Sequence, residues 1–286
     1  MLGKKTVQSL TRDDILDVLR PIWSSKTETA SRLRGRLEAL FTFAIVSGKY
    51  PGQNPALWRG GLSLFLPPRA KIAPVEHQEA VSLAETKAVL HSLDLEKLSI
   101  EWAAIIFGIL TCARVNEFAQ ARWSEIDMTS AVWSCPRRKD GKDYPHRVPL
   151  SRQALLLLRG LKRTPDSDFI FASAHGSSGH ISLETPRTLI LKRLRHGTMH
   201  GFRSTFRDWA AEAGVDRVLA EKSLMRATGS AVEQAYQRSD LLEQRRPLMQ
   251  AWQMKSCRLS EVSCTLLESG VKRRNSARKK EFHFAG

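Results

Sequence analysis

Two arginines, a histidine and a tyrosine stand in three short segments whose side chains could carry out one reaction. Arg114 lies within Thr111-Cys112-Ala113-Arg114-Val115-Asn116-Glu117, and His200 and Arg203 lie within His200-Gly201-Phe202-Arg203. Tyr236 lies within Ala235-Tyr236-Gln237-Arg238-Ser239-Asp240. A guanidinium group is planar, permanently charged and matched to phosphate oxygens. Two of them could hold the charge that develops when a tyrosine hydroxyl attacks a phosphodiester. We therefore expect metal-free attack on a DNA phosphodiester.

The remaining roles follow from what this attack requires. A phenol with a pKa of about 10 needs nearby positive charge or a base. His200 lies three residues before Arg203, so on a helix both would face one site, where His200 could orient the phosphate or accept the tyrosine proton. Lys139 or Lys142, in a turn between two predicted strands, could protonate the departing sugar oxygen. Spacing alone equally allows ordinary structural or solvated roles for each of these residues.

The sequence lacks the motifs of metal-dependent and nucleotide-binding enzymes that act on phosphates. The sequence has no cluster of carboxylates, histidines or cysteines with metal-ligand spacing, and neither GxxxxGK[ST] nor GxGxxG occurs. We therefore expect no metal and no cofactor.

The composition favours a polyanionic partner. The 286 residues include 45 Lys+Arg against 29 Asp+Glu, a net charge of +16 and a pI near 10.1. Nucleic acid, an RNA-rich assembly or an anionic membrane surface would suit this charge. No apolar run is long enough to span a membrane, and the N-terminus has no apolar export signal. The four cysteines lack paired spacing, so we expect free thiols in the cytoplasm.

Hydrophobic periodicity predicts a mainly α protein. We expect a helix from a cap at Thr11 to Pro21, and a longer one from Thr27 to Ser47 with Gly48 after it. The buried stripe of the longer helix is Leu33, Leu37, Leu40, Phe41 and Ala44. Arg32, Arg34 and Arg36 fall mostly away from it, as a solvated face or as phosphate contacts. Our candidates for DNA binding are Arg32, Arg36 and, in the turn between the predicted strands, Lys142.

The second half combines helices with a small antiparallel sheet. Helices are predicted at 84–93 and 98–110, after a cap at Ser151, and over most of 183–252, with strands at 131–135 and 145–150. A polar linker at 69–78 separates the halves. We expect a helical DNA-binding domain at 1–78, a catalytic domain at 79–254 and a flexible basic tail at 255–286.

In four ordered segments the chain resembles the tyrosine recombinases, particularly phage and genomic-island integrases. Leu110 to Glu117 resembles their first arginine box, and Lys139 to Ser151 resembles their lysine-bearing β-hairpin. His200 to Ala210 resembles the second box, and Ala235 to Leu241 resembles the segment of the nucleophile. Lys139 aligns with the family lysine, with Lys142 as the alternative. Where the family usually has His or Trp, about ten residues before the tyrosine, this chain has Arg226. We keep Arg226 as a catalytic candidate, because an arginine could donate to a phosphate oxygen there, although its bulk and fixed charge could misplace the phosphate.

The resemblance implies a mechanism and partners. Tyr236 would form a 3′-phosphotyrosyl DNA and release a 5′-hydroxyl without metal or ATP. A helical core-binding domain and an α-rich catalytic domain with a small antiparallel sheet would clamp double-stranded DNA at attachment sites. The protein would act as a homotetramer, with accessory DNA-bending proteins and no membrane. The family's usual arm-binding domain and the extra core-binding helix after it are not visible before Thr11, so we expect a shortened core-binding domain.

Two other functions fit the same residues. A DNA-binding remnant of a prophage integrase would occupy sites without cutting them, which Arg226 favours. A type IB topoisomerase-like enzyme would share the chemistry and relax DNA without a specific site.

Overall fold

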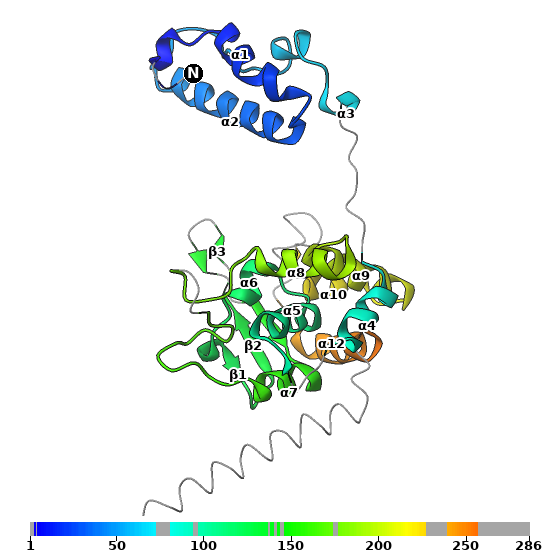
Figure 1. The fold of residues 1–286 in the computed structure, drawn as a ribbon. Helices are drawn as coiled ribbons and strands as arrows, with labels where there is room; N and C mark the ends of the chain where they lie inside the picture. Colours follow the sequence, from blue (N-terminus) through cyan, green and yellow to red (C-terminus); the bar gives the residue numbers. More distant parts are fainter. Residues whose placement is uncertain are drawn as a thin grey trace, which may run out of the picture. The chain divides into compact units, whose positions relative to one another are not determined.

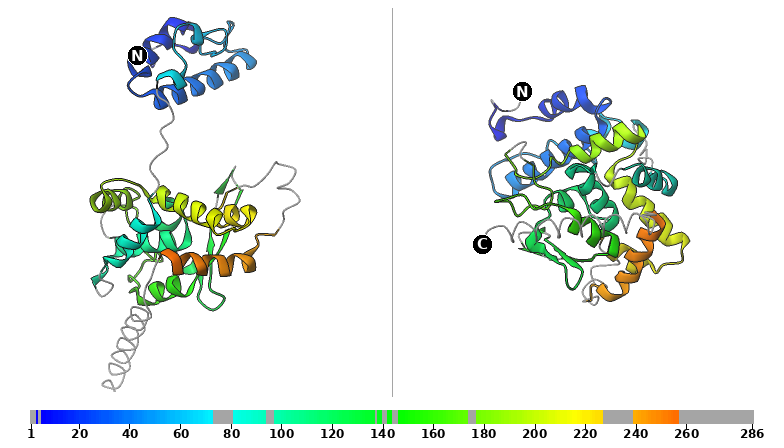
Figure 2. Two further views of the ribbon diagram at one scale, coloured as in Figure 1. Left: turned by 90° about the vertical axis from the view of Figure 1, so that its right-hand side faces the viewer. Right: turned by 60° about the horizontal axis from the view of Figure 1, so that its bottom comes forward.

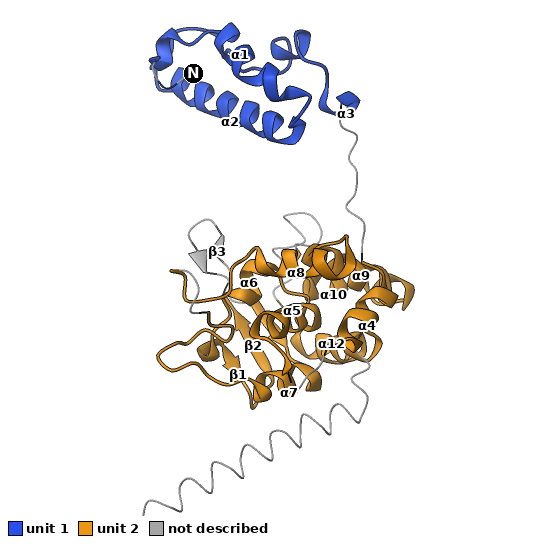
Figure 3. Ribbon diagram, viewed as in Figure 1, with its two compact units in different colours: residues 1–77 blue, residues 78–286 orange. Residues whose placement is uncertain are grey.

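The computed structural model describes residues 3, 5–72, 81–93, 97–136, 138–139, 142–143, 146–173, 177–226 and 239–256. The fold is mainly helical with a small antiparallel sheet (Figure 1), so the predicted fold class is confirmed. The chain divides into two compact units, residues 1–77 and 78–286, each with its own hydrophobic core (Figure 3).

Unit 1 is built on two helices. Helix α1 (Arg12–Trp23) begins at Thr11, whose hydroxyl accepts from the backbone of Asp14 while the Asp14 carboxylate accepts from the backbone of Thr11. Helix α2 (Thr27–Val46) is followed by Gly48, whose positive φ of 66° suits the residue after a helix end. The short helices η2 (Val7–Ser9), η3 (Leu62–Leu64) and α3 (Arg69–Ile72) complete this unit. Its core holds Ile15, Leu16, Leu19, Trp23, Ala30, Phe41 and Leu62.

Several details of this unit differ from the sequence prediction. Helix α1 continues through Pro21 to Trp23, which is buried and whose indole donates to the Pro67 carbonyl at 2.9 Å. Leu40 is 51% exposed because it lies about 100° around α2 from the buried Phe41. The start of the predicted linker, Arg69 to Ile72, forms α3.

Arg34 also differs from the prediction of an outward-facing row of arginines. Its guanidinium pairs with Glu38, donates to the Ala56 carbonyl at 3.3 Å and lies 5.5 Å from the centre of the Trp58 ring. Arg34 therefore supports unit 1, whereas Arg32 and Arg36 are exposed.

Unit 2 surrounds one apolar helix, α5 (Ile100–Thr111), whose residues 103–111 are all buried. Helices α6 (Val115–Ala119), α7 (Arg152–Gly160), α8 (Thr185–Leu194), α9 (Met199–Glu212) and α12 (Leu242–Ser256) pack against it (Figure 2). Helix α4 (Leu83–His91) packs on α9 and α12, and α10 (Arg217–Ser223) lies between the same two. The predicted cap at Ser151 is confirmed, because its hydroxyl accepts from the backbone of Ala154.

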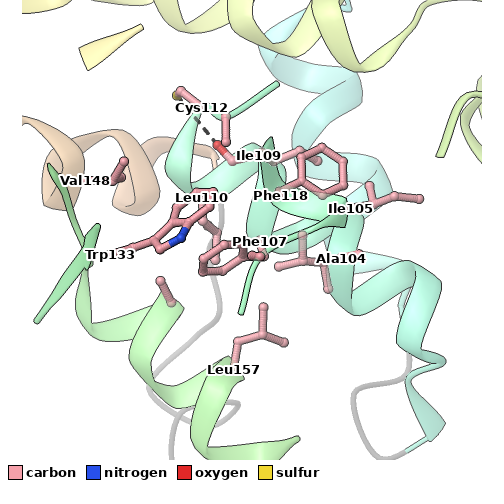
Figure 4. Close-up of a cluster of buried hydrophobic side chains, with 14 of the residues drawn as sticks. Ala104, Ile105, Phe107, Ile109, Leu110, Cys112, Phe118, Trp133, Val148 and Leu157 are labelled. Carbon is pink, nitrogen blue, oxygen red and sulfur yellow. Dashed lines mark hydrogen bonds between the residues drawn. The ribbon is translucent and has the colours of Figure 1, made fainter. Parts of the chain in front are cut away.

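The sheet lies at one side of this core. Strands β1 (Ile126–Asp127), β2 (Val132–Cys135) and β5 (His146–Pro149) form an antiparallel sheet in the order β1-β2-β5, with η5 (Trp123–Glu125) before β1. Both predicted strands are confirmed, and Cys135 pairs with His146. Strands β3 (Arg138–Lys139) and β4 (Lys142–Asp143) form a separate pair. Trp133 of β2 and Val148 of β5 join Phe107 of α5 and Leu157 of α7 in the core (Figure 4).

Two sequence predictions concern the end of the chain. Helix α12 extends to Ser256, two residues beyond the expected catalytic domain, and the buried Ser256 hydroxyl donates to the Trp252 carbonyl. Cys257, Cys264 and the rest of the predicted tail lie outside the described residues. Within the described part of the chain, no helix is both long and apolar enough to cross a membrane.

Candidate functional site

Arg114 is held at the junction between α5 and α6. Helix α5 is capped at its C-terminal end by Cys112, which has a left-handed φ of 52°, and this turn places Arg114 immediately before α6. The Glu117 carboxylate accepts from the Arg114 backbone at 2.7 Å and from its guanidinium at 3.0 Å. A second guanidinium nitrogen lies 3.5 Å from the Met225 carbonyl. The Arg114 side chain is 38% exposed, so it is fixed and still open to a ligand.

Arg203 is the buried member of the site. It comes from α9, is 2% exposed, and donates to the carbonyls of Cys112 and Leu224, at the ends of α5 and α10. Its Nε is buried and has no hydrogen-bond partner within the described part of the structure. Burial, and then the charge of Arg114, lower the pKa of Arg203 to about 10. The group remains a cation at neutral pH, and it keeps the ends of the two helices together.

Arg226 follows the end of α10. Met225 takes a positive φ of 54°, and the Arg226 backbone donates to the Glu221 carbonyl at 2.9 Å. The Arg226 guanidinium lies 3.8 Å from the Glu221 carboxylate, which also accepts from Arg207 at 2.8 Å. Glu221 is thus shared by two arginines and balances the charge of Arg226 only in part.

The charges of all three arginines lower the pKa of His200. It is an exposed residue of the first turn of α9, and its pKa is lowered from 6.5 by partial burial and then by Arg203, Arg226 and Arg114. The charges of residues from separate segments of the sequence therefore act on the same imidazole. The result is a group of three cationic side chains, Arg114, Arg203 and Arg226, with the His200 imidazole beside them, which suits an anionic ligand with several oxygens.

Other predicted residues are placed only in part or not at all. Tyr236 lies outside the described residues. Lys139 and Lys142 pair with each other across β3 and β4, and the structure describes only their backbone. Arg32 and Arg36 lie on α2 of unit 1. Among the described residues, no group of three or more His, Cys, Asp and Glu side chains could hold a metal ion.

Comparison with known proteins identifies the family. Residues 76–242 match the model of the phage integrase family, and residues 1–61 match that of the phage integrase central domain. The chain belongs to the phage integrase family. The resemblance predicted from the sequence is thereby confirmed.

Relatives in this integrase family are distant in sequence. The chain is 28% identical over 278 residues to "Putative protein IntB" of Escherichia coli K12, covering 88% of this chain and 67% of that protein. It is 27% identical over 256 residues to prophage integrase IntA of the same organism, covering 88% and 60%. The chain thus spans 60% of the length of IntA and 67% of that of IntB.

The fold is shared with solved integrases. A lambda integrase tetramer bound to a Holliday junction aligns with a TM-score of 0.55 and 18% sequence identity, covering 79% of this chain and 66% of that chain. At this identity the likeness concerns the fold alone.

A second polar group in unit 2 was missed in the sequence. Arg147 of β5 and Asp240 form two hydrogen bonds of 2.8 and 2.9 Å, and Arg245 of α12 is fully buried near them. Asp240 precedes an amphipathic run, so its role near a helix start could have been predicted. Its pairing with Arg147, 93 residues away, leaves no local signal.

Proposed function

We propose that this chain is a site-specific DNA recombinase that cuts and rejoins strands through a 3′-phosphotyrosyl intermediate. The observation that carries the proposal is that the guanidinium groups of Arg114 and Arg203 contact the carbonyls of Met225 and Leu224, the two residues before Arg226. Three cations held this close repel one another, and a bound phosphodiester would relieve that repulsion. Preorganised donors aimed at developing negative charge give large rate enhancements.

The bond changes follow from the residues assigned. The Tyr236 oxygen attacks phosphorus, its proton passes to a base, and the bond between phosphorus and the 5′-oxygen breaks. His200 is the candidate base, because its lowered pKa keeps it neutral at pH 7. The departing 5′-oxygen takes a proton from a lysine. Attack by a 5′-hydroxyl of a partner strand then reverses these steps and releases the tyrosine.

The general acid stays a choice between two lysines. Lys139 and Lys142 are directly paired across β3 and β4, so their backbones lie side by side and either could supply the proton. Separate substitutions Lys139→Ala and Lys142→Ala distinguish them. Loss of the acid should be rescued by a substrate whose leaving group is a 5′-thiol, since a thiolate departs without protonation.

The partners of the proposed reaction follow from its substrate. We take this to be double-stranded DNA at attachment sites, bound by the three arginines around His200, by Arg32 and Arg36 of α2, and by Lys142 if Lys139 is the general acid. The lambda integrase of like fold was solved as a tetramer bound to a Holliday junction, which supports a homotetramer here. Accessory DNA-bending proteins and a cytoplasmic, nucleoid-associated location belong to the same proposal. The proposed domain assignment is DNA binding for 1–78 and catalysis for 79–254.

A covalent-trapping assay tests the proposal. A nicked attachment-site duplex that loses a short fragment after cleavage should accumulate a protein–DNA adduct. The adduct should be absent in Tyr236→Phe and present in the control Tyr144→Phe, which changes the same side chain outside the nucleophile segment. An adduct that persists in Tyr236→Phe would rule out the assigned nucleophile. Relaxation of plasmid lacking the site would instead favour a topoisomerase-like activity.

One observation favours a second function, site occupation without cutting. Arg226 carries a permanent charge and a pairing with Glu221, where the resemblance calls for His or Trp. If this displaces the phosphate, the unsubstituted chain should bind DNA without forming an adduct, and Arg226→His should restore the adduct. Adduct formation by the unsubstituted chain excludes this alternative.

A further inference from the structure

The Asp240 carboxylate lies beside two arginines from different elements. Its carboxylate accepts from Nε and Nη2 of Arg147 in β5 at 2.8 and 2.9 Å, and lies 3.9 Å from Nη2 of Arg245 in α12. The backbone of Leu242, the first residue of α12, also donates to Asp240 at 3.2 Å. Burial disfavours the charged carboxylate, but the bonds from Arg147 and Leu242 outweigh it and lower the Asp240 pKa. Asp240 is therefore ionised at neutral pH.

Arg245 extends this contact into the core. Its fully buried guanidinium donates to His146 Nε2 at 3.0 Å, to the Arg147 carbonyl and, at 3.4 Å, to the Lys222 carbonyl at the end of α10. The Lys222 ammonium donates to the Ser239 carbonyl. We call Arg147, Asp240 and Arg245 the Asp240 junction. Contacts from β5 and α10, together with those within α12, hold residues 239–245 in place.

The junction lies close in sequence to two residues of the proposed reaction. Tyr236 precedes Asp240 by four residues, so their Cα atoms are at most about 14 Å apart. Lys142 precedes Arg147 by five residues, a reach of at most about 18 Å. On the other side, Tyr236 follows Arg226 by ten residues, so that connection restricts it far less.

We infer that the Asp240–Arg147 ion pair positions the nucleophile, by tethering the chain after Tyr236 to the strand after the lysine hairpin. This rests on the proposed function. Asp240 and Arg147 act through Tyr236 and the hairpin, and neither is assigned a contact with the reacting atoms. Orientation of reacting groups is sensitive, since a misplacement of about 1 Å costs roughly a hundredfold in rate.

Asp240→Asn tests the inference with little disturbance. Asparagine keeps an oxygen for the Leu242 backbone and removes the charge that Arg147 and Arg245 share. At saturating suicide substrate the rate of adduct formation should fall roughly tenfold to a hundredfold. The Kd for DNA should not rise, because the variant is one charge more positive. Glu243→Gln, which removes one charge from the Glu243–Arg246 pair on the same helix, should leave the rate unchanged.

A double-mutant cycle with Arg147→Ala separates positioning from general damage. If the two residues act as one device, Asp240→Asn with Arg147→Ala should be no slower than the slower single variant. A normal rate in Asp240→Asn, or rate losses that multiply in the double variant, would overturn the inference. Should Asp240→Asn unfold at the assay temperature, Arg147→Lys carries the same test, because it keeps the charge and loses the paired bonds.

The two levels of the proposal fail differently. An unsubstituted chain that forms no adduct overturns the proposed function, and the positioning role with it. An unsubstituted chain that forms the adduct at the rate of Asp240→Asn overturns the positioning role alone.

Discussion

At the scale of single residues, Arg114 and Arg203 share a proposed ligand and differ in what they do for the fold. Arg203 satisfies the carbonyls of Cys112 and Leu224 inside the protein, whereas Arg114 is partly exposed and bonded to its neighbour Glu117. Leaving a buried carbonyl without a donor costs about 1–3 kcal/mol. We expect Arg203→Gln to lower the free energy of unfolding by at least that amount, and Arg114→Gln by less than about 1 kcal/mol.

Urea denaturation of the two variants measures this difference. Both should lose the adduct, so activity alone does not distinguish them. Equal stability of the two variants would mean that the carbonyl contacts of Arg203 contribute little to the fold.

His200 gives a prediction about pH. Its folded pKa lies below 6.5, so the unfolded chain binds more protons in that region. Its contribution to stability should therefore be complete above pH 6.5 and decline as the pH falls through the unfolded pKa. In the free protein, the NMR titration midpoint of His200 should lie below 6.5, and His200→Gln should weaken the acid-side decline. A midpoint above 6.5 would show that a nearby anion outweighs the three arginines.

At the scale of elements, we expect alanine substitution at two helical glycines to have opposite effects on stability. A Cβ on Gly108 of α5 would lie 2.6 Å from two ring atoms of the buried Phe118 and 3.0 Å from Met199 Cε. Gly108→Ala should therefore destabilise unit 2 by about 1–3 kcal/mol, because α6 and α9 must move. A Cβ on Gly35 of α2 meets no atom within 4 Å. Gly35→Ala should stabilise unit 1 by about 0.5–1 kcal/mol through helix propensity.

Calorimetry of both variants checks this pair of predictions, each variant serving as the control for the other. Stabilisation by Gly108→Ala would show that the approach of α6 to α5 is looser than the structure has it.

The helices also show which structural features could be predicted from the sequence and which could not. Thr11 and Ser151 were predicted as caps because a cap is a local contact between residues about three positions apart. His200 and Arg203 could be placed on one side of a helix for the same reason. Leu40 could not be placed, because the boundary of a buried face depends on what packs against it. The burial of Arg245 depends on β5 and α10, which local sequence does not specify.

At the scale of the whole molecule, the net charge of +16 predicts binding governed by salt. Each phosphate neutralised releases condensed counterions and adds about 0.9 to the slope of log affinity against log salt concentration. Recombinase, topoisomerase and DNA-binding remnant would all show a steep slope. The informative quantity is the change in slope when one arginine is removed.

Helix α2 offers that measurement with an internal control. Arg32 has a side chain 73% exposed and Arg36 is exposed as well, whereas Arg34 is held by Glu38, Ala56 and Trp58. Arg32→Ala and Arg36→Ala should each reduce the slope by about 1 if they contact phosphates. Arg34→Ala removes the same charge and should instead lower the melting temperature of unit 1, with the slope unchanged. If all three variants reduce the slope equally, the arginines act only through total charge, and α2 is not the DNA-binding face.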